Sequence, residues 1–106
     1  LKGRGRGILI LGDMLELGRH AKKMHEKIGA MAARSNISLL YATGEFAETV
    51  ARSAEGGGMK AENIHTGNKK EIVDDLTERL RANDWVLVKG SRGMGMEEVV
   101  KDLMSC

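Results

Sequence analysis

The sequence predicts an α/β domain of the three-layer, Rossmann-like class, with a mainly parallel sheet covered by helices on both faces. Strand-like segments alternate with helical segments along the whole chain. Two of the strand-like segments are apolar runs that suit a buried strand, and each is followed by a loop that contains glycine. Because consecutive parallel strands are joined by right-handed crossovers, this alternation predicts parallel pairing.

Four strands are expected. The first is at residues 8–11, where four apolar residues follow one another, and the strongest signal is at residues 85–89. Weaker strands are expected at residues 38–41 and 63–65. The chain begins at Leu1 rather than Met and leads abruptly into the strand at residues 8–11, so we expect it to be a fragment that lacks an upstream helix.

Four helices are expected, at residues 19–35, 45–55, 69–81 and 96–104, because apolar side chains recur there on one helical face. Asn68 is a candidate N-cap of the third helix. The apolar stripe expected on the first helix consists of Ala21, Met24, Ile28, Met31 and Ala32.

The composition limits the class of protein. A length of 106 residues, 42% of them hydrophobic and 30% charged, predicts one soluble domain over residues 1–106. The net charge of +2 is too small to indicate a nucleic-acid partner, and no apolar run approaches the roughly 20 residues of a membrane helix. A single cysteine, Cys106, fits a cytoplasmic protein. The basic residues 2–7 are expected to form a solvated loop, because their glycines precede a strand and a phosphate fingerprint must follow one.

Asp13 is the first candidate ligand residue, because it lies just beyond the strand at residues 8–11. Ligands of open α/β sheets bind at the carboxyl ends of strands, where a carboxylate can accept hydrogen bonds from two ribose hydroxyls. Asp after Gly is also ordinary turn chemistry, so both interpretations stay open. Glu16 is a weaker candidate, because an acid in a first helical turn is favoured by the helix dipole.

The second candidate is the loop KGSRGMG at residues 89–95. Lys89 and Arg92 supply positive charge, Ser91 supplies a hydroxyl, and the helix start that follows supplies amide donors. This combination favours the binding of a carboxylate or phosphate ligand. The alternative is a glycine-rich turn whose charged side chains are solvated. The spacing matches neither a Walker A loop nor GxGxxG.

The sequence predicts no catalytic residue and no metal site. His20 and His25 are five positions apart, whereas the zinc motif HExxH needs four, and there is no cysteine pair. His25 lies near the expected buried face of its helix, where a histidine is more often a packed structural residue than a catalyst.

Two motifs together carry a family resemblance. LGDMLELG at residues 11–18, followed by His25 and Ile28-Gly29, and VKGSR at residues 88–92, followed by Met96-Glu97, resemble the C-terminal domain of the Mur ligases. Within this family the sequence more closely resembles the D-alanyl-D-alanine-adding type (MurF type), and the similarity spans nearly the whole chain. Either motif alone would be weak, but the pair is specific.

The resemblance implies an ATP-dependent amide ligase of peptidoglycan synthesis. Such enzymes phosphorylate the terminal carboxyl of UDP-N-acetylmuramoyl-tripeptide, and the amine of D-alanyl-D-alanine attacks the acyl phosphate. By the family pattern, Asp13 would contact the ATP ribose. The residues expected near the amino substrate or the phosphates are Lys89, Ser91 and Arg92, with Glu16 and His25 as further candidates.

The departures from the family pattern are equally informative. The GKT/S phosphate loop of the central domain has no counterpart here, nor does the YNANP-like segment with its strand and helix. We therefore expect an inactive C-terminal domain whose partners are the N-terminal and central domains, with ATP and Mg²⁺ used only by the full-length enzyme. In isolation, a bare sheet edge would favour dimerisation. The alternative is a stand-alone, non-catalytic α/β module that binds a nucleotide or small anion.

Overall fold

The computed structural model describes residues 5–105, without the side chains of Glu16, Leu17 and Arg92. Strands and α-helices alternate over this part of the chain in the predicted order. Their bounds are β1 Gly7–Leu11, α1 Ala21–Arg34, β2 Ile37–Ala42, α2 Ala47–Gly56, β3 Ile64–Thr66, α3 Lys69–Arg79, β4 Trp85–Lys89 and α4 Glu97–Met104. The prediction missed three short 3-10 helices, which are η1 Leu15–His20, η2 Ala61–Asn63 and η3 Arg92–Met94.

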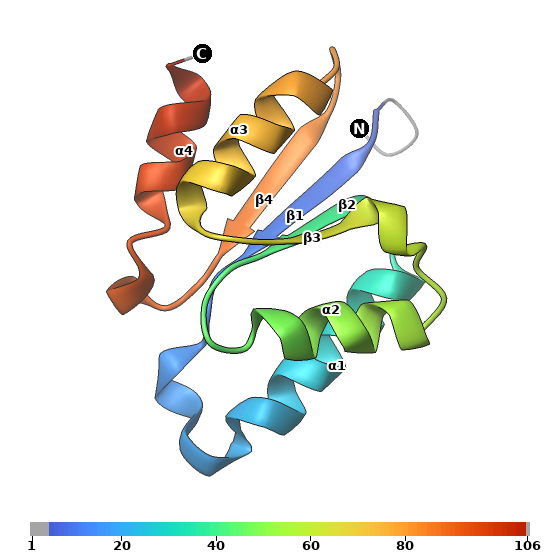
Figure 1. Ribbon diagram of the computed structural model, residues 1–106, viewed down its shortest axis with the longest axis vertical. Coiled ribbons are helices and arrows are strands. Elements are labelled where there is room, and N and C mark those ends of the chain that lie inside the picture. The colour runs from blue at the N-terminus through green and yellow to red at the C-terminus, as the bar shows by residue number, and fades with distance from the viewer. Residues whose placement is uncertain (1–4, 106) are drawn as a thin grey trace.

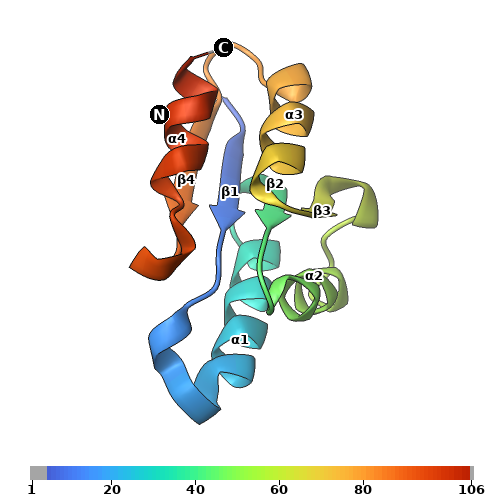
Figure 2. The same ribbon diagram turned by 60° about the vertical axis from the view of Figure 1, so that its left-hand side comes forward.

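The strands form one parallel sheet in the order β3-β2-β1-β4. Helices α1 and α2 cover one face, and α3 and α4 cover the other (Figures 1 and 2). The predicted three-layer class is therefore confirmed. β1 is central, with Ile10 in register with Tyr41 of β2 and Val88 of β4, so both of its edges and both of its faces are occupied.

Side chains of the strands alternate between two hydrophobic clusters, because successive residues of a strand point to opposite faces. Ile8 and Ile10 of β1 belong to the cluster under α3 and α4. Leu9 and Leu11 belong to the cluster under α1 and α2. The continuous apolar run at the start of the chain is thus explained by burial on both faces.

The expected apolar stripe of α1 is partly wrong. Met24 and Met31 are 37% and 58% exposed, whereas the buried positions are Ala21, His25, Gly29 and Ala32. Small residues are needed because α1 packs closely on α2: a Cβ atom on Gly29 would lie 2.4 Å from the carbonyl oxygen of Val50. Helix α1 therefore turns its small-residue face inward and leaves the methionines outside.

Asn68 caps α3, as predicted. Its Oδ1 accepts a hydrogen bond from the N–H of Glu71 at 2.8 Å. The Glu71 carboxylate accepts one in return from the N–H of Asn68, also at 2.8 Å. This capping box begins α3 directly after β3.

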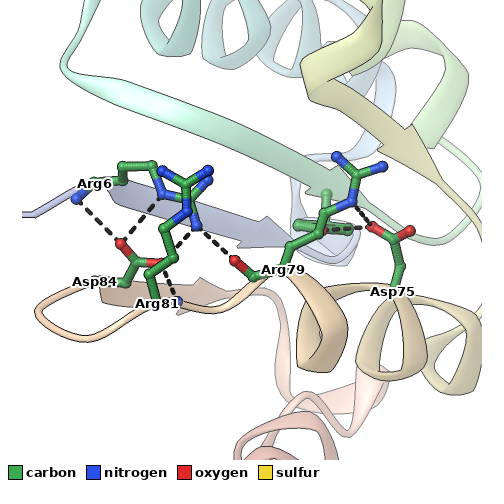
Figure 3. Close-up of polar contacts among 6 residues, drawn as sticks. Arg6, Asp75, Arg79, Arg81 and Asp84 are labelled. Atoms are coloured by element: carbon green, nitrogen blue, oxygen red, sulfur yellow. Dashed lines mark hydrogen bonds and ion pairs between the residues drawn. The ribbon is translucent and has the colours of Figure 1, made fainter.

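Arg6 was expected in a solvated loop but is held at the amino-terminal edge of the sheet (Figure 3). Its guanidinium donates to the Asp84 carboxylate at 2.8 Å, and the Asp84 side chain is 2% exposed. The hydrogen bond from Arg6 holds the pKa of Asp84 below its ordinary value. Residues 2–4 of the same basic segment lie outside the described residues.

A second polar contact on the α3 side of the sheet involves Tyr41. The Tyr41 hydroxyl donates to Asp75 of α3 at 2.6 Å, and Asp75 also pairs with Arg79 at 2.9 Å (Figure 3). Burial raises the pKa of Tyr41, and the hydrogen bond to Asp75 raises it further. These contacts join β2 to α3.

Candidate functional site

Three loops meet at the carboxyl-terminal edge of the sheet. They are loop 1 (residues 12–14) after β1, loop 2 (residues 43–46) after β2, and loop 4 (residues 90–96) after β4. Since the strands are parallel and adjacent, their carboxyl ends lie along one edge. Both motif loops singled out from the sequence are therefore neighbours, with loop 2 on the other side of loop 1.

Loop 1 and loop 4 are joined by direct hydrogen bonds. The N–H of Gly12 donates to the carbonyl of Lys89 at 2.7 Å, and the N–H of Ser91 donates to the carbonyl of Asp13 at 2.9 Å. The Oγ atom of Ser91 accepts from the N–H of Leu15 at 2.6 Å. The two motifs thus form one structural unit.

Asp13 joins loop 1 to loop 2. Its Oδ2 accepts from the N–H of Glu45 at 2.7 Å, and its Oδ1 accepts from the N–H of Phe46 at 2.9 Å. The residue is only 4% exposed. Gly44 makes this approach feasible, because its φ is +107° and a Cβ atom there would lie 2.6 Å from the carboxylate. Loop 2 was not nominated from the sequence, although a glycine between a strand and a helix was a usable signal.

His25 lies behind loops 1 and 2. It is 1% exposed, and its Nε2 accepts from the N–H of Met14 at 3.1 Å. Its Nδ1 is 2.6 Å from the carbonyl oxygen of Ala21, and its ring stacks on Phe46 with centroids 4.4 Å apart. His25 is therefore packed in the interior, as the sequence analysis expected for a histidine on this face of the helix.

The charged candidates differ in how far they can be placed. Lys89 is exposed and lies on the face of the sheet that carries α1. Ser91 is half-buried at the start of loop 4. Arg92 and Glu16 belong to 3-10 helices η3 and η1, but their side chains lie outside the described part of the structure.

The start of α4 is a less favourable anion-binding site than the sequence analysis expected. Glu97 and Glu98 occupy its first turn, and two acids there compensate the positive end of the helix dipole. Glu98 also pairs with Lys69 at 2.8 Å. The remaining cationic group of known position beside loop 4 is the exposed ammonium of Lys89.

An apolar groove adjoins the site on the α1 side of the sheet. Trp85 and Leu87 of the edge strand β4 are 38% and 45% exposed there, and Met31 of α1 faces them across the groove. Met14 and Lys89 line its end at the carboxyl edge. The groove therefore runs along the sheet toward loop 1.

The structure offers no metal centre among the described side chains, where no three His, Cys, Asp or Glu residues are grouped to hold an ion. In the described part of the chain, no helix combines the length and apolar character needed to cross a membrane.

The sequence motifs and the fold agree with one protein family. The profile described as "Mur ligase, glutamate ligase domain" matches residues 1–92. The chain belongs to the Mur ligase family. This finding confirms the resemblance carried by residues 11–18 and 88–92.

Curated relatives of this Mur ligase domain carry a common name. The UDP-N-acetylmuramoyl-tripeptide--D-alanyl-D-alanine ligase of Bacillus subtilis is 36% identical over 104 residues, which cover 98% of this chain and 23% of the relative. The Escherichia coli ligase of the same name is 31% identical over 101 residues, covering 93% of this chain and 21% of that protein. The chain thus spans less than a quarter of the length of these relatives.

Solved structures show the same fold. A structure of MurF from Acinetobacter baumannii has a TM-score of 0.82 and 24% identity, over 96% of this chain and 23% of that one. MurF ligase from Thermotoga maritima, solved in complex with ADP, has a TM-score of 0.72 and 27% identity, over 95% of this chain and 22% of that one.

Proposed function

We propose that this chain is the C-terminal, substrate-closing domain of an ATP-dependent ligase that adds D-alanyl-D-alanine to UDP-N-acetylmuramoyl-tripeptide in peptidoglycan synthesis. The relatives at 31–36% identity carry that name. The observation that carries the proposal is the bond between Ser91 Oγ and the N–H of Leu15, because it joins the two motif loops into one site. In the complete enzyme, the tripeptide carboxyl is phosphorylated and the incoming amine attacks the acyl phosphate.

Within that enzyme, Asp13 is proposed to contact the ATP ribose. Both of its oxygens already accept amide hydrogen bonds, from Glu45 and Phe46. A carboxylate oxygen has a second lone pair, so a ribose hydroxyl would share the group with loop 2. Binding of the ribose would then also order loop 2.

The amino substrate is proposed to lie along loop 4. Lys89 supplies an exposed ammonium that suits the carboxylate of D-alanyl-D-alanine. Ser91 and Arg92 are assigned to the same substrate by their place in the motif. Glu16 and His25 are the secondary candidates, and His25 would act from behind the loop because it is buried.

The remaining parts of the reaction are assigned to other domains. The curated relatives are more than four times longer than the segment they share with this chain. By the family pattern, the Mg²⁺ that accompanies ATP is proposed to be held by the central domain. The 106 residues alone are proposed to form no amide bond, and the complete enzyme is proposed to be cytoplasmic.

The exposed apolar groove supports the proposal that this chain is only part of a domain. A parallel sheet is normally covered on both faces, yet Trp85 and Leu87 are exposed on the α1 side. We propose that a strand and helix from the segment preceding this chain complete the domain and cover the groove. In isolation, a second copy that pairs at the edge of β4 is the competing occupant.

Kinetics of the complete enzyme test the proposal. Asp13→Ala should raise the apparent KM for ATP, whereas Ser91→Ala and Arg92→Ala should raise mainly the KM for D-alanyl-D-alanine. Unchanged constants in all three variants would remove the assigned site. Amide formation by residues 1–106 alone would contradict the domain assignment.

The second candidate function is a stand-alone module that binds a nucleotide or small anion, and the exposed Lys89 beside loop 4 favours it. Calorimetry of residues 1–106 with ATP and with D-alanyl-D-alanine distinguishes the two. Micromolar binding would favour the module, and absence of heat would favour the dependent domain.

A further inference from the structure

The imidazole of His25 connects helix α1 to two of the three loops at the site. Its Nε2 contacts loop 1 through the N–H of Met14 at 3.1 Å, and its ring lies against Phe46 of loop 2 with an interplanar angle of 15°. Its Nδ1 is anchored to the carbonyl of Ala21 in its own helix at 2.6 Å. One side chain therefore sets the position of both loops relative to α1.

The hydrogen-bond partners assign the tautomer of His25. A backbone N–H can only donate, so Nε2 must present its lone pair to Met14. The neutral ring then carries its proton on Nδ1, which donates to the carbonyl oxygen of Ala21. Both ring nitrogens are engaged and the residue is 1% exposed, so a direct contact with a substrate would need these bonds to break.

Loop 1 divides its contacts among three elements. The Asp13 carboxylate binds loop 2 and the Asp13 carbonyl accepts from Ser91 of loop 4. The next residue, Met14, donates its N–H to His25 of α1, and Leu15 at the start of η1 donates to Ser91 Oγ. The bond to His25 thus lies between two successive contacts with Ser91, those of Asp13 and Leu15. If it is lost, the orientation of loop 1 is no longer tied to the helix that follows it.

We propose that His25 is a positioning residue, which orients loop 1 through Met14 so that Ser91 of loop 4 and the carboxylate of Asp13 are held in one arrangement for substrate. This inference deepens the proposed function and rests on it for the identity of the substrate. The ordinary alternative is a histidine that only fills the core. The two roles differ in whether the acceptor at Nε2 matters independently of packing.

Two variants separate these roles. His25→Phe keeps an aromatic ring against Phe46 but removes the acceptor, whereas His25→Gln offers a side-chain oxygen as acceptor. In the complete ligase we expect His25→Phe to raise the KM for the amino substrate about fivefold, the equivalent of one hydrogen bond. The exchange rate of the Met14 amide, measured by hydrogen–deuterium exchange, should rise by about the same factor. His25→Gln should restore both values toward wild type.

Equal losses in the two variants would overturn the proposal, as would a lower unfolding midpoint with unchanged KM and Met14 exchange. A long-range ¹H–¹⁵N spectrum of the unsubstituted protein gives a test that needs no variant: the proton must be on Nδ1, and a proton on Nε2 alone would overturn the assignment. If the unsubstituted complete enzyme makes no amide bond with D-alanyl-D-alanine, the proposed function fails. The tautomer and the Met14 exchange rate still decide the role of His25 in that case.

Discussion

The Oγ atom of Ser91 lies 2.6 Å from the backbone nitrogen of Leu15, 76 positions away in the sequence, and accepts its hydrogen bond. Ser91 also donates its own N–H to the carbonyl of Asp13. A residue assigned to substrate binding is therefore also a structural link between loops 1 and 4. Its replacement should affect local structure and substrate binding together.

Ser91→Ala should lower the free energy of unfolding by about 1 kcal/mol, because the N–H of Leu15 loses its acceptor. Hydrogen–deuterium exchange at the Leu15 amide should become faster. The matched control is Ser105→Ala, whose hydroxyl bonds only locally to the carbonyl of Lys101 in α4 and should change stability by less than about 0.5 kcal/mol. An unchanged exchange rate at Leu15 would argue against the link.

Asp13→Asn should destabilise the domain by about 1–3 kcal/mol in urea unfolding. Asn has one oxygen where Asp has two, so one of the N–H groups of Glu45 and Phe46 would face another donor. Asp74→Asn, at an exposed position of α3, is the control and should change stability little. In the complete enzyme, a loss of stability without any change in the KM for ATP would assign Asp13 a structural role alone.

Gly44→Ala should be more destabilising than Gly58→Ala, although both glycines have nearly the same φ angle. Their φ angles are +107° and +109°, so the strain of placing an L-residue there is similar and of order 1–3 kcal/mol. At Gly44 the new Cβ would also lie 2.6 Å from the Asp13 carboxylate, whereas at Gly58 it would meet open space. The difference between the two unfolding free energies measures the closeness of loops 1 and 2, and equal values would contradict it.

Acid should weaken the fold through Asp84. Arg6 holds the pKa of the folded carboxylate below its ordinary value of 3.8. Its contribution to stability is therefore complete above that ordinary value and is lost as the pH falls through the folded pKa. Asp84→Asn should make stability depend less steeply on pH below 3.8, and Arg6→Gln should have the same effect. Additive effects in the double variant would show that the two residues act independently.

Trp85 reports on the apolar groove, because it is the single tryptophan of the chain and is 38% exposed. In residues 1–106 at low concentration, acrylamide should quench its fluorescence efficiently. In the complete protein, with any other tryptophan replaced by phenylalanine, quenching of Trp85 should fall as the preceding segment covers the groove. If a second copy of the chain covers the groove instead, protection of Trp85 from quenching should rise with protein concentration, and Leu87→Lys should abolish that protection. Met104→Lys, an 82% exposed position of α4, is the control.

The alternation of strands and helices could be predicted from the residues, and their bounds agree with the structure to within two positions. Apolar runs such as residues 8–11, and the cap at Asn68, are local signals that depend on few neighbours in sequence. The exposed Met24 and Met31 could not be predicted in the same way. Helical spacing alone does not tell which side of an apolar stripe meets a close neighbour such as α2.

The fold class, the family and the two loops that carry the candidate residues could be inferred from the amino-acid sequence, because hydrophobic period and motif are properties of nearby residues. The folded structure was needed to show that the two loops touch, that Asp13 is bonded to loop 2, and that both nitrogens of His25 are engaged. The first two facts depend on β1 lying between β2 and β4. Strand order brings together residues tens of positions apart, and no local pattern records it.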